Sequence, residues 1–334
     1  MPKTVKVAFI GSGGMAQAHV PGLEKMEGVK IAGFCDVSLD RAKQMAAAHG
    51  GQGFKSATKM LDATEPDCCY VLLPPFAHGR AEMACIEREI PFFIEKPINK
   101  SWRQACSIAQ AVADKNLLTS AGYMNRYHKA IRKAQKTLSK DPAVYVNGGW
   151  IGGTPSPDPS RPISVWWVQK AMSGGQFVEQ VTHTVDIVRF LCGDATDVSA
   201  FAAQGFNKGI PTYDIDDAMA VCIKFKSGAV ANLHSCCASN ARGGVSLDVY
   251  ASKIAFEFRG WGHDCKVFKK GQVTEEIPGD PNIFRVEDEA FIKAVRSGTD
   301  SAILCSYADA LKTLEITLAA NKSAEKGKAV KLTQ

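Results

Sequence analysis

The feature that most constrains this chain is an apolar run that ends in a glycine-rich turn, VKVAFIGSGGMA at residues 5–16. The run is typical of a buried parallel strand, and Gly11, Gly13 and Ala16 give the G-x-G-x-x-A spacing of a dinucleotide-binding turn. Gly11 permits the tight turn, Gly13 lets the backbone approach a pyrophosphate, and Ala16 lets the next helix pack against the strand. That helix, expected to begin near Met15, points its first N–H groups at the phosphates. The pattern therefore predicts a nucleotide-binding strand–turn–helix unit.

An acidic residue in the next strand indicates which nucleotide is bound. The apolar residues 31–35 end in Asp36, about twenty residues after Ala16. A carboxylate there accepts hydrogen bonds from the ribose hydroxyls of the adenosine half, and it repels a 2′-phosphate. NAD is therefore predicted in preference to NADP. Arg41 partly offsets the repulsion, so NADP remains the alternative.

Length and composition are those of a globular protein with two domains. The chain has 334 residues, more than one ordinary core accommodates, with 46% hydrophobic and 22% charged residues. No stretch is long and apolar enough for a membrane span, and no signal-peptide pattern precedes the first strand, so we expect a cytoplasmic protein. The net charge of +6 is scattered, which argues against nucleic acid as a partner.

The 11 cysteines are expected to be reduced core residues, because many, such as Cys68, Cys69 and Cys222, lie within apolar strands. The chain has no C-x-x-C motif and no clustered histidines and cysteines at ligand spacing. We therefore predict no metal site.

The order of the elements predicts two domains of different architecture. Strands and helices alternate up to Tyr123, which predicts a doubly wound Rossmann domain over residues 1–123. Residues 124–334 then read as an α/β domain with a mostly antiparallel sheet, whose strands include a hairpin turning at residues 226–228. A proline-rich loop is expected at residues 153–164.

Polar residues that follow the fourth and fifth strands are candidates for chemistry, since ligands of parallel sheets lie at the carboxyl ends of the strands. Lys96 follows a buried strand and is held between Glu95 and Pro97. Its ammonium is suited to stabilising an alkoxide, although a surface lysine is the alternative. His78, just after Pro74–Pro75, either faces a nicotinamide or caps its own helix.

A second group of candidates lies in the C-terminal half. An amphipathic helix is expected over residues 173–191, and it places Glu179, His183 and Asp186 on one face. A histidine flanked by carboxylates takes up a proton near neutral pH, although packing alone is the alternative. Trp167, beside Trp166, either stacks on a sugar ring or packs in the core.

Three motifs together resemble the Gfo/Idh/MocA oxidoreductases: GSGGMA at 11–16, EKP at 95–97 and GGQFVEQVTHTVD at 174–186. The resemblance extends to the closing residues 308–332. It implies a Rossmann domain followed by an α/β domain with a large open sheet, which often mediates dimer or tetramer formation. It also implies hydride transfer between a nicotinamide and a ring hydroxyl of a sugar, sugar derivative or cyclitol.

By motif position, Lys96 is similar to the family's catalytic lysine and His183 to its general acid/base. The family commonly has aspartate four residues before that histidine, where this chain has Glu179. The longer side chain leaves the choice of substrate hydroxyl open.

The predicted residues fall into three sets. The predicted catalytic residues are Lys96, His183 and Glu179. The predicted cofactor-binding residues are Gly11, Ser12, Gly13, Gly14, Met15, Ala16, Asp36, Arg41, Leu73, Pro74, Pro75, His78, Glu95 and Lys96. The predicted substrate-binding residues are Lys96, Tyr123, Asn125, Arg126, Trp167, Glu179, His183 and Asp186.

Two other functions are compatible with the same resemblance. Some family members keep NAD bound and hydrolyse glycosides without net oxidation. A nucleotide-sensing protein that has kept the fold and lost the chemistry is the second alternative.

Overall fold

The computed structural model describes residues 4–158, 160 and 162–333, and the chain forms two compact units. The first comprises Met1–Met124 and Asn282–Leu311, and the second Asn125–Pro281 and Lys312–Gln334. The change of unit after Met124 lies one residue beyond the predicted boundary. Residues 282–311, by contrast, were expected in the second domain and belong to the first unit.

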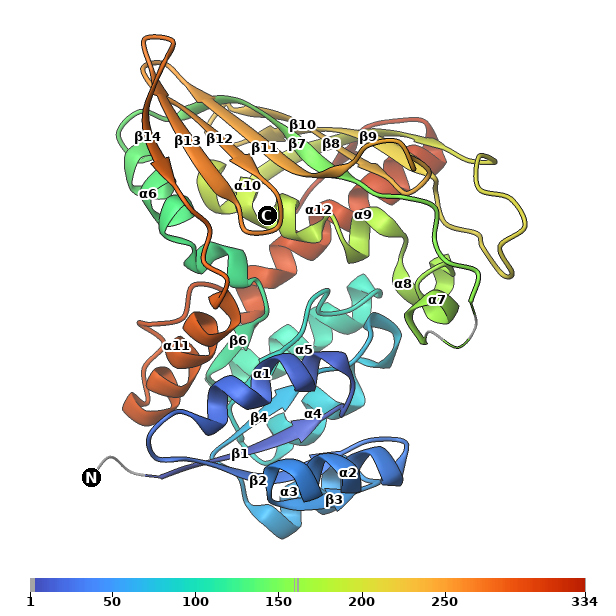
Figure 1. The fold of residues 1–334 in the computed structure, drawn as a ribbon, viewed down its shortest axis with the longest axis vertical. Helices are drawn as coiled ribbons and strands as arrows, with labels where there is room; N and C mark the ends of the chain where they lie inside the picture. The colour runs from blue at the N-terminus through green and yellow to red at the C-terminus, as the bar shows by residue number, and fades with distance from the viewer. Residues whose placement is uncertain (1–3, 159, 161, 334) are drawn as a thin grey trace. The chain divides into compact units, whose positions relative to one another are not determined.

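The first unit contains a six-stranded sheet in the order β3-β2-β1-β4-β5-β6, and each neighbouring pair is parallel (Figure 1). Its strands are β1 (Val5–Ile10), β2 (Val29–Cys35), β3 (Gln52–Phe54), β4 (Cys68–Val71), β5 (Phe92–Ile94) and β6 (Thr119–Ala121). Its helices are α1 (Gly14–Glu24), α2 (Leu39–His49), α3 (Ala57–Thr64), the 3-10 turn η1 (Pro75–Ala77), α4 (Arg80–Glu87), α5 (Trp102–Asp114) and α11 (Ile283–Ser297). The Rossmann prediction is confirmed.

The core of this sheet explains why residues 282–311 belong to the first unit. In β1, Val7 and Phe9 point to the same face, because side chains alternate along a strand. They form one buried cluster with Ala16 of α1 and with Phe291 and Ile292 of α11. Helix α11 therefore buries its apolar side against the six-stranded sheet.

The second unit contains a nine-stranded sheet in the order β14-β13-β12-β11-β7-β10-β9-β8-β15. Its strands are β7 (Ala143–Ile151), β8 (Ala195–Ala203), β9 (Ala218–Phe225), β10 (Val230–Cys236), β11 (Gly244–Ala251), β12 (Ala255–Arg259), β13 (Asp264–Lys269), β14 (Gln272–Ile277) and β15 (Val330–Lys331). Its helical elements are α6 (Lys129–Leu138), α7 (Pro162–Trp166), α8 (Lys170–Ser173), α9 (Gln176–Glu179) and α10 (Thr182–Cys192); η2 (Met124–Tyr127) and α12 (Tyr307–Lys326) lie partly in each unit. Strands β7 and β10 are parallel and the other described neighbours are antiparallel, as predicted.

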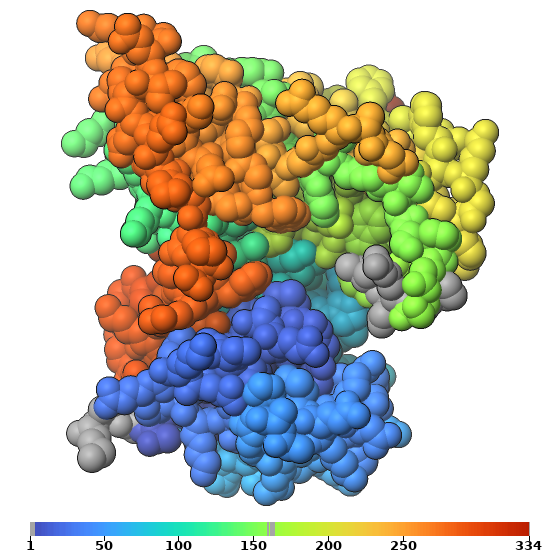
Figure 2. Space-filling model, viewed as in Figure 1, coloured from blue at the N-terminus to red at the C-terminus, as the bar shows by residue number. Residues whose placement is uncertain are grey.

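Helices cover one face of the second sheet. Figure 1 shows α6, α10 and α12 on the same side, and their apolar residues form one core with the strands. Strand β9 shows the consequence, since Val221 and Ile223 are buried whereas Ala220, Cys222 and Lys224 are exposed. The edge strand β14, orange in Figure 2, is exposed over almost its whole length.

The same alternation corrects one expectation about the cysteines. All 11 are free thiols, and Cys68 and Cys69 are buried as predicted. Cys222, which we also expected in the core, is exposed because it lies on the uncovered face of β9. In the part of the chain that the structure describes, no helix could cross a membrane and no cluster of three metal-ligating side chains occurs.

The predicted long helix over residues 173–191 is wrong. The structure has three shorter helices there, α8, α9 and α10, and the chain turns between α8 and α9 at two glycines. Gly174 and Gly175 have φ angles of 82° and 90°, a region that favours glycine and ends a right-handed helix. A second break separates Glu179 from Thr182. Glu179 is therefore the last residue of α9, and His183 lies in the first turn of α10.

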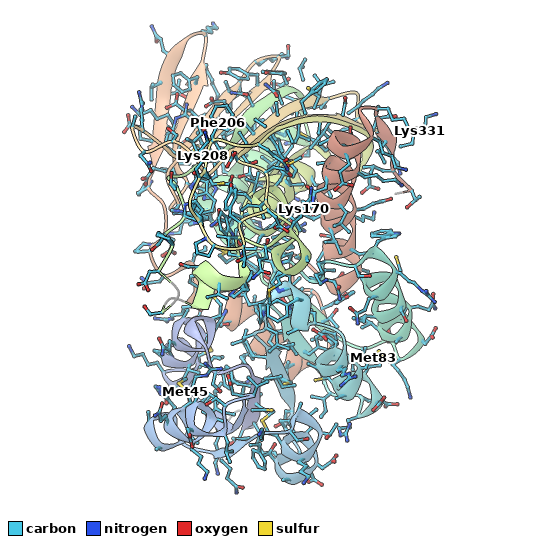
Figure 3. The ribbon with its side chains drawn as sticks, turned by 90° about the vertical axis from the view of Figure 1, so that its right-hand side faces the viewer. Met45, Met83, Lys170, Phe206, Lys208 and Lys331 are labelled. Atoms are coloured by element: carbon cyan, nitrogen blue, oxygen red, sulfur yellow. The ribbon has the colours of Figure 1, made fainter. Side chains whose placement is uncertain are left out.

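The proline-rich loop is shorter than predicted at its C-terminal end, where α7 begins at Pro162. Residues 159 and 161 of that loop lie outside the described part. Beyond α7, Lys170 forms ion pairs with Asp216 and Glu325, and these tie the start of α8 to the segment before β9 and to α12. Figure 3 labels Lys170, and it also labels Phe206 and Lys208 in the segment between β8 and β9.

Candidate functional site

The glycine turn after β1 has the space that a dinucleotide phosphate needs. Gly11 has a φ of +102°, and a Cβ there would lie 2.2 Å from the Leu72 carbonyl oxygen, so only glycine fits. At Gly13 and Gly14 an added Cβ would meet no atom within 4 Å. Helix α1 starts there without a side-chain cap and without an acidic residue in its first turn. The turn therefore presents N–H groups and open space to an anion.

Asp36 is held against this turn from the end of β2. Its Oδ2 accepts a hydrogen bond from the Ser12 N–H at 3.0 Å, and its Oδ1 accepts from the Ser38 N–H at 2.8 Å. Arg41 donates to the same Oδ1 from Nη2 at 2.7 Å. Burial alone would raise the pKa of Asp36, but Arg41 and the two N–H groups hold it below its usual value. The carboxylate is therefore ionised at neutral pH.

The residues after β4 form a turn whose geometry bears on His78. Leu73 and Pro74 are half-buried, Pro75 begins η1, and the His78 ring is buried. The Nδ1 atom of His78 lies 2.5 Å from Glu82 Oε1, while Glu82 Oε2 accepts from the Gly79 N–H. Of the two predicted roles, the structure favours a histidine that stabilises the start of its own helix.

Glu95 and Lys96 follow β5 at the same edge of the sheet. Glu95 is buried, and its Oε2 accepts a hydrogen bond from the Lys96 N–H at 3.0 Å. Its Oε1 lies 3.3 Å from Nε2 of His19, a fully buried residue of α1 that sequence analysis did not single out. Tyr123 follows β6 and is buried as well. The strand ends of the first unit thus collect most of the predicted cofactor residues.

In the second unit, His183 lies near the start of α10 with the ring of Trp261 beside it. The His183 and Trp261 rings are perpendicular, with centroids 6.0 Å apart, and Trp261 makes an edge contact with Trp150 at 4.9 Å. Trp261 is 48% exposed although it is a large apolar residue. This tryptophan was not among the predicted site residues; the signal in the sequence was its place between Gly260 and Gly262.

Glu179 contacts Trp167, with the indole Nε1 donating to Glu179 Oε2 at 2.9 Å. Both side chains are buried. The Trp167 ring packs with Val168 and Ile215 in a small apolar cluster, so the structure favours the core alternative for this residue. Its hydrogen bond fixes the direction of the Glu179 carboxylate.

Asp186 is part of a buried ion pair. Both of its oxygens accept from Arg126, from Nε and Nη2 at 2.7 Å each, and Thr313 also donates to Oδ1 at 2.9 Å. Arg126 is 2% exposed. Sequence analysis placed Asp186 beside His183 or on substrate hydroxyls, but its lone pairs are committed to Arg126. Asn125, next along the chain, is buried, and its amide has no partner in the described structure.

Comparison with known families agrees with this geometry. The model of an oxidoreductase family with an NAD-binding Rossmann fold, Gfo/Idh/MocA, matches residues 5–123, and the model of that family's C-terminal domain matches residues 151–257. The chain belongs to the Gfo/Idh/MocA family. Its first unit is therefore an NAD-binding Rossmann domain of an oxidoreductase.

Curated relatives match along the whole chain. The scyllo-inositol 2-dehydrogenase (NAD(+)) of Bacillus subtilis is 25% identical, over 99% of this chain and 97% of its own length. The myo-inositol 2-dehydrogenase of Thermotoga maritima is 23% identical, over 99% of each chain.

Among solved structures, a levoglucosan dehydrogenase in complex with NADH and levoglucosan superposes with a TM-score of 0.88. It is 20% identical and covers 99% of this chain and 100% of its own. At that identity the likeness extends to the fold.

Proposed function

We propose that this protein is an NAD-dependent dehydrogenase that acts on a ring hydroxyl of a sugar, sugar derivative or cyclitol. The observation that carries the proposal is the full-length similarity to two inositol 2-dehydrogenases, in a chain that has Lys96 at the nucleotide-binding sheet and His183 beside an exposed tryptophan. Inositol is the substrate of those two relatives. For this chain we propose only the same class of reaction, the NAD-dependent oxidation of a ring hydroxyl.

NAD supplies the hydride acceptor, and the residues of this chain supply positioning and charge. His183 removes the proton of the substrate hydroxyl, and the Lys96 ammonium stabilises the negative charge that develops on its oxygen. Glu179, held by Trp167, orients the neighbouring hydroxyls or His183. We reassign Asp186 from substrate binding to holding Arg126.

The cofactor is held by the turn after β1 and by Asp36. The Gly11–Ala16 turn receives the pyrophosphate, and the ionised Asp36 accepts from the ribose hydroxyls, which favours NAD. NADP is the alternative if Arg41, which is half exposed, leaves Asp36 for a 2′-phosphate. Asp36→Ser is expected to raise kcat/KM with NADP relative to kcat/KM with NAD.

Trp261 gives the proposed substrate a surface on which to stack. Its exposed ring stands next to His183, and the apolar face of a pyranose or cyclitol packs well against indole. This favours a ring substrate over an open-chain polyol.

The proposal is tested by screening reduction of NAD and NADP against inositols, sugars, sugar acids and glycosides, followed by two variants. Lys96→Ala and His183→Ala are each expected to lower kcat by about a hundredfold or more, with NADH affinity changed less than about threefold. Lys100→Ala, an exposed lysine of the same turn, is the control. Wild-type rates in both variants would contradict the proposal, and release of nitrophenol without net NADH would identify a glycoside hydrolase.

We further propose that the protein is a homodimer or homotetramer that associates through the uncovered face of the second sheet. That face exposes the stacked rings of Tyr145 and Tyr250, and also Phe201, which is 76% exposed. Light scattering after gel filtration measures the subunit number, and a monomer at micromolar concentration would exclude the assembly.

A further inference from the structure

A charged network that sequence analysis did not anticipate lies inside the first unit. The His19 ring is fully buried, between Asp288 Oδ1 at 2.8 Å from Nδ1 and Glu95 Oε1 at 3.3 Å from Nε2. Tyr70 donates its hydroxyl hydrogen to the same Asp288 oxygen at 3.0 Å. The aromatic rings of Tyr70, Phe93 and Phe284 enclose the imidazole. Three distant segments thus meet at one histidine.

The two carboxylates favour a protonated His19, while burial raises the pKa of Asp288 against the opposing effect of His19. A carboxylate at each ring nitrogen makes both nitrogens donors, which only the imidazolium permits. Burial alone would lower the pKa of His19, but Asp288 and Glu95 outweigh it and raise the pKa to about 10. Two buried carboxylates without this cation would each lose a partner, which buried charges tolerate poorly.

Glu95 connects His19 to the main chain of Lys96. One carboxylate oxygen faces His19 and the other accepts from the Lys96 N–H, so the Glu95 side chain spans from α1 to the peptide that carries Lys96. Gly122 leaves the room for it, since a Cβ at that position would lie 3.1 Å from Glu95 Oε1. The carboxylate is thus fixed at both of its oxygens.

We propose that His19 is a positioning residue for Lys96: it fixes the Glu95 carboxylate, and Glu95 fixes the main chain from which the Lys96 ammonium projects. The inference rests on the proposed function, in which Lys96 contacts the substrate hydroxyl. It adds a residue to the reaction that touches neither substrate nor cofactor.

The test is a double-mutant cycle between His19 and Lys96. His19→Gln retains a side-chain donor for one carboxylate and removes the charge. If His19 acts through Lys96, His19→Gln lowers kcat about tenfold or more in the wild-type background and less than about twofold in the Lys96→Ala background. The NADH dissociation constant, measured by fluorescence, is expected to change less than about threefold, which separates positioning of Lys96 from damage to the turn.

The matched control is His49→Gln, because His49 also pairs with a carboxylate, Glu24, in the same unit but lies near the surface. It is expected to leave kcat unchanged. If His19→Gln does not fold, Glu95→Gln takes its place in the cycle, since it keeps the size of the side chain and removes its charge.

Each outcome separates the two proposals. A kcat of His19→Gln within about twofold of wild type overturns the inference, and so does a loss that is the same in both backgrounds or a parallel loss of NADH affinity. In all three cases the proposed function stands as long as Lys96→Ala itself lowers kcat by about a hundredfold. A fully active Lys96→Ala variant would instead refute the role of Lys96 and the inference together.

Discussion

Because the imidazolium of His19 is buried, the free energy of unfolding of the first unit should decrease as the pH rises above neutral, by an amount that follows from the pKa of His19. In an unfolded chain a histidine has a pKa of about 6.5, and in the folded protein the pKa of His19 is about 10. A raised pKa contributes stability that is fully present below the unfolded value and is lost as the pH rises through the folded value. Stability should therefore fall as the solution becomes more alkaline.

The effect of His19 on stability is best measured in the window between about pH 7 and about pH 8.5, where few other groups titrate. Below it, the buried neutral histidines His128 and His263, whose pKa values are lowered by burial, contribute with the opposite sign. Above it, thiols such as Cys265, with a pKa raised to about 12, add their own loss. Within the window the unfolded chain binds nearly one proton less than the folded protein at position 19. At about 1.4 kcal/mol for each pH unit, His19 accounts for a loss of about 2 kcal/mol.

The measurement is urea unfolding, followed by circular dichroism, of the wild type and of His19→Gln across this window. The free energy of unfolding of the wild type is expected to fall by about 2 kcal/mol across this window. The variant reports the groups that do not face His19, but it leaves Asp288, whose pKa burial raises and His19 lowers, without its cation. A wild-type free energy of unfolding that stays constant across the window would refute the idea that His19 is charged in the core.

Two further predictions concern the second unit. Asp186→Asn leaves Arg126 buried with a weakened partner, so it should lower the free energy of unfolding by about 3–5 kcal/mol. Asp62→Asn, in an exposed ion pair, should leave the free energy of unfolding almost unchanged. Equal losses in the two variants would show that burial adds nothing to the Arg126–Asp186 pair. Trp261→Ala should raise the substrate KM about tenfold with little change in kcat, and Trp261→Phe should recover most of the loss, with Trp102→Ala of α5 as the control. An unchanged KM would exclude stacking on Trp261.

The sequence by itself determined the nucleotide-binding half of this protein. The glycine turn, the acid at position 36 and the helix over residues 39–49 depend on neighbours close in the chain, and β1, α2 and Asp36 occur where they were predicted. Alternation of buried and exposed residues was sufficient for the antiparallel strands β9 and β10. Local pattern fixes such elements because their hydrogen bonds and burial repeat with a short period.

Only the tertiary structure decided which partner each buried charge has. His19 meets Asp288, 269 residues away, and Arg126 meets Asp186, 60 residues away. The helix break after Glu179 likewise put Glu179 and His183 on two different helices, α9 and α10. The cation that pairs with a buried carboxylate cannot be predicted from the local sequence. That pairing is set by how the core packs and by the free-energy cost of burying an unpaired charge.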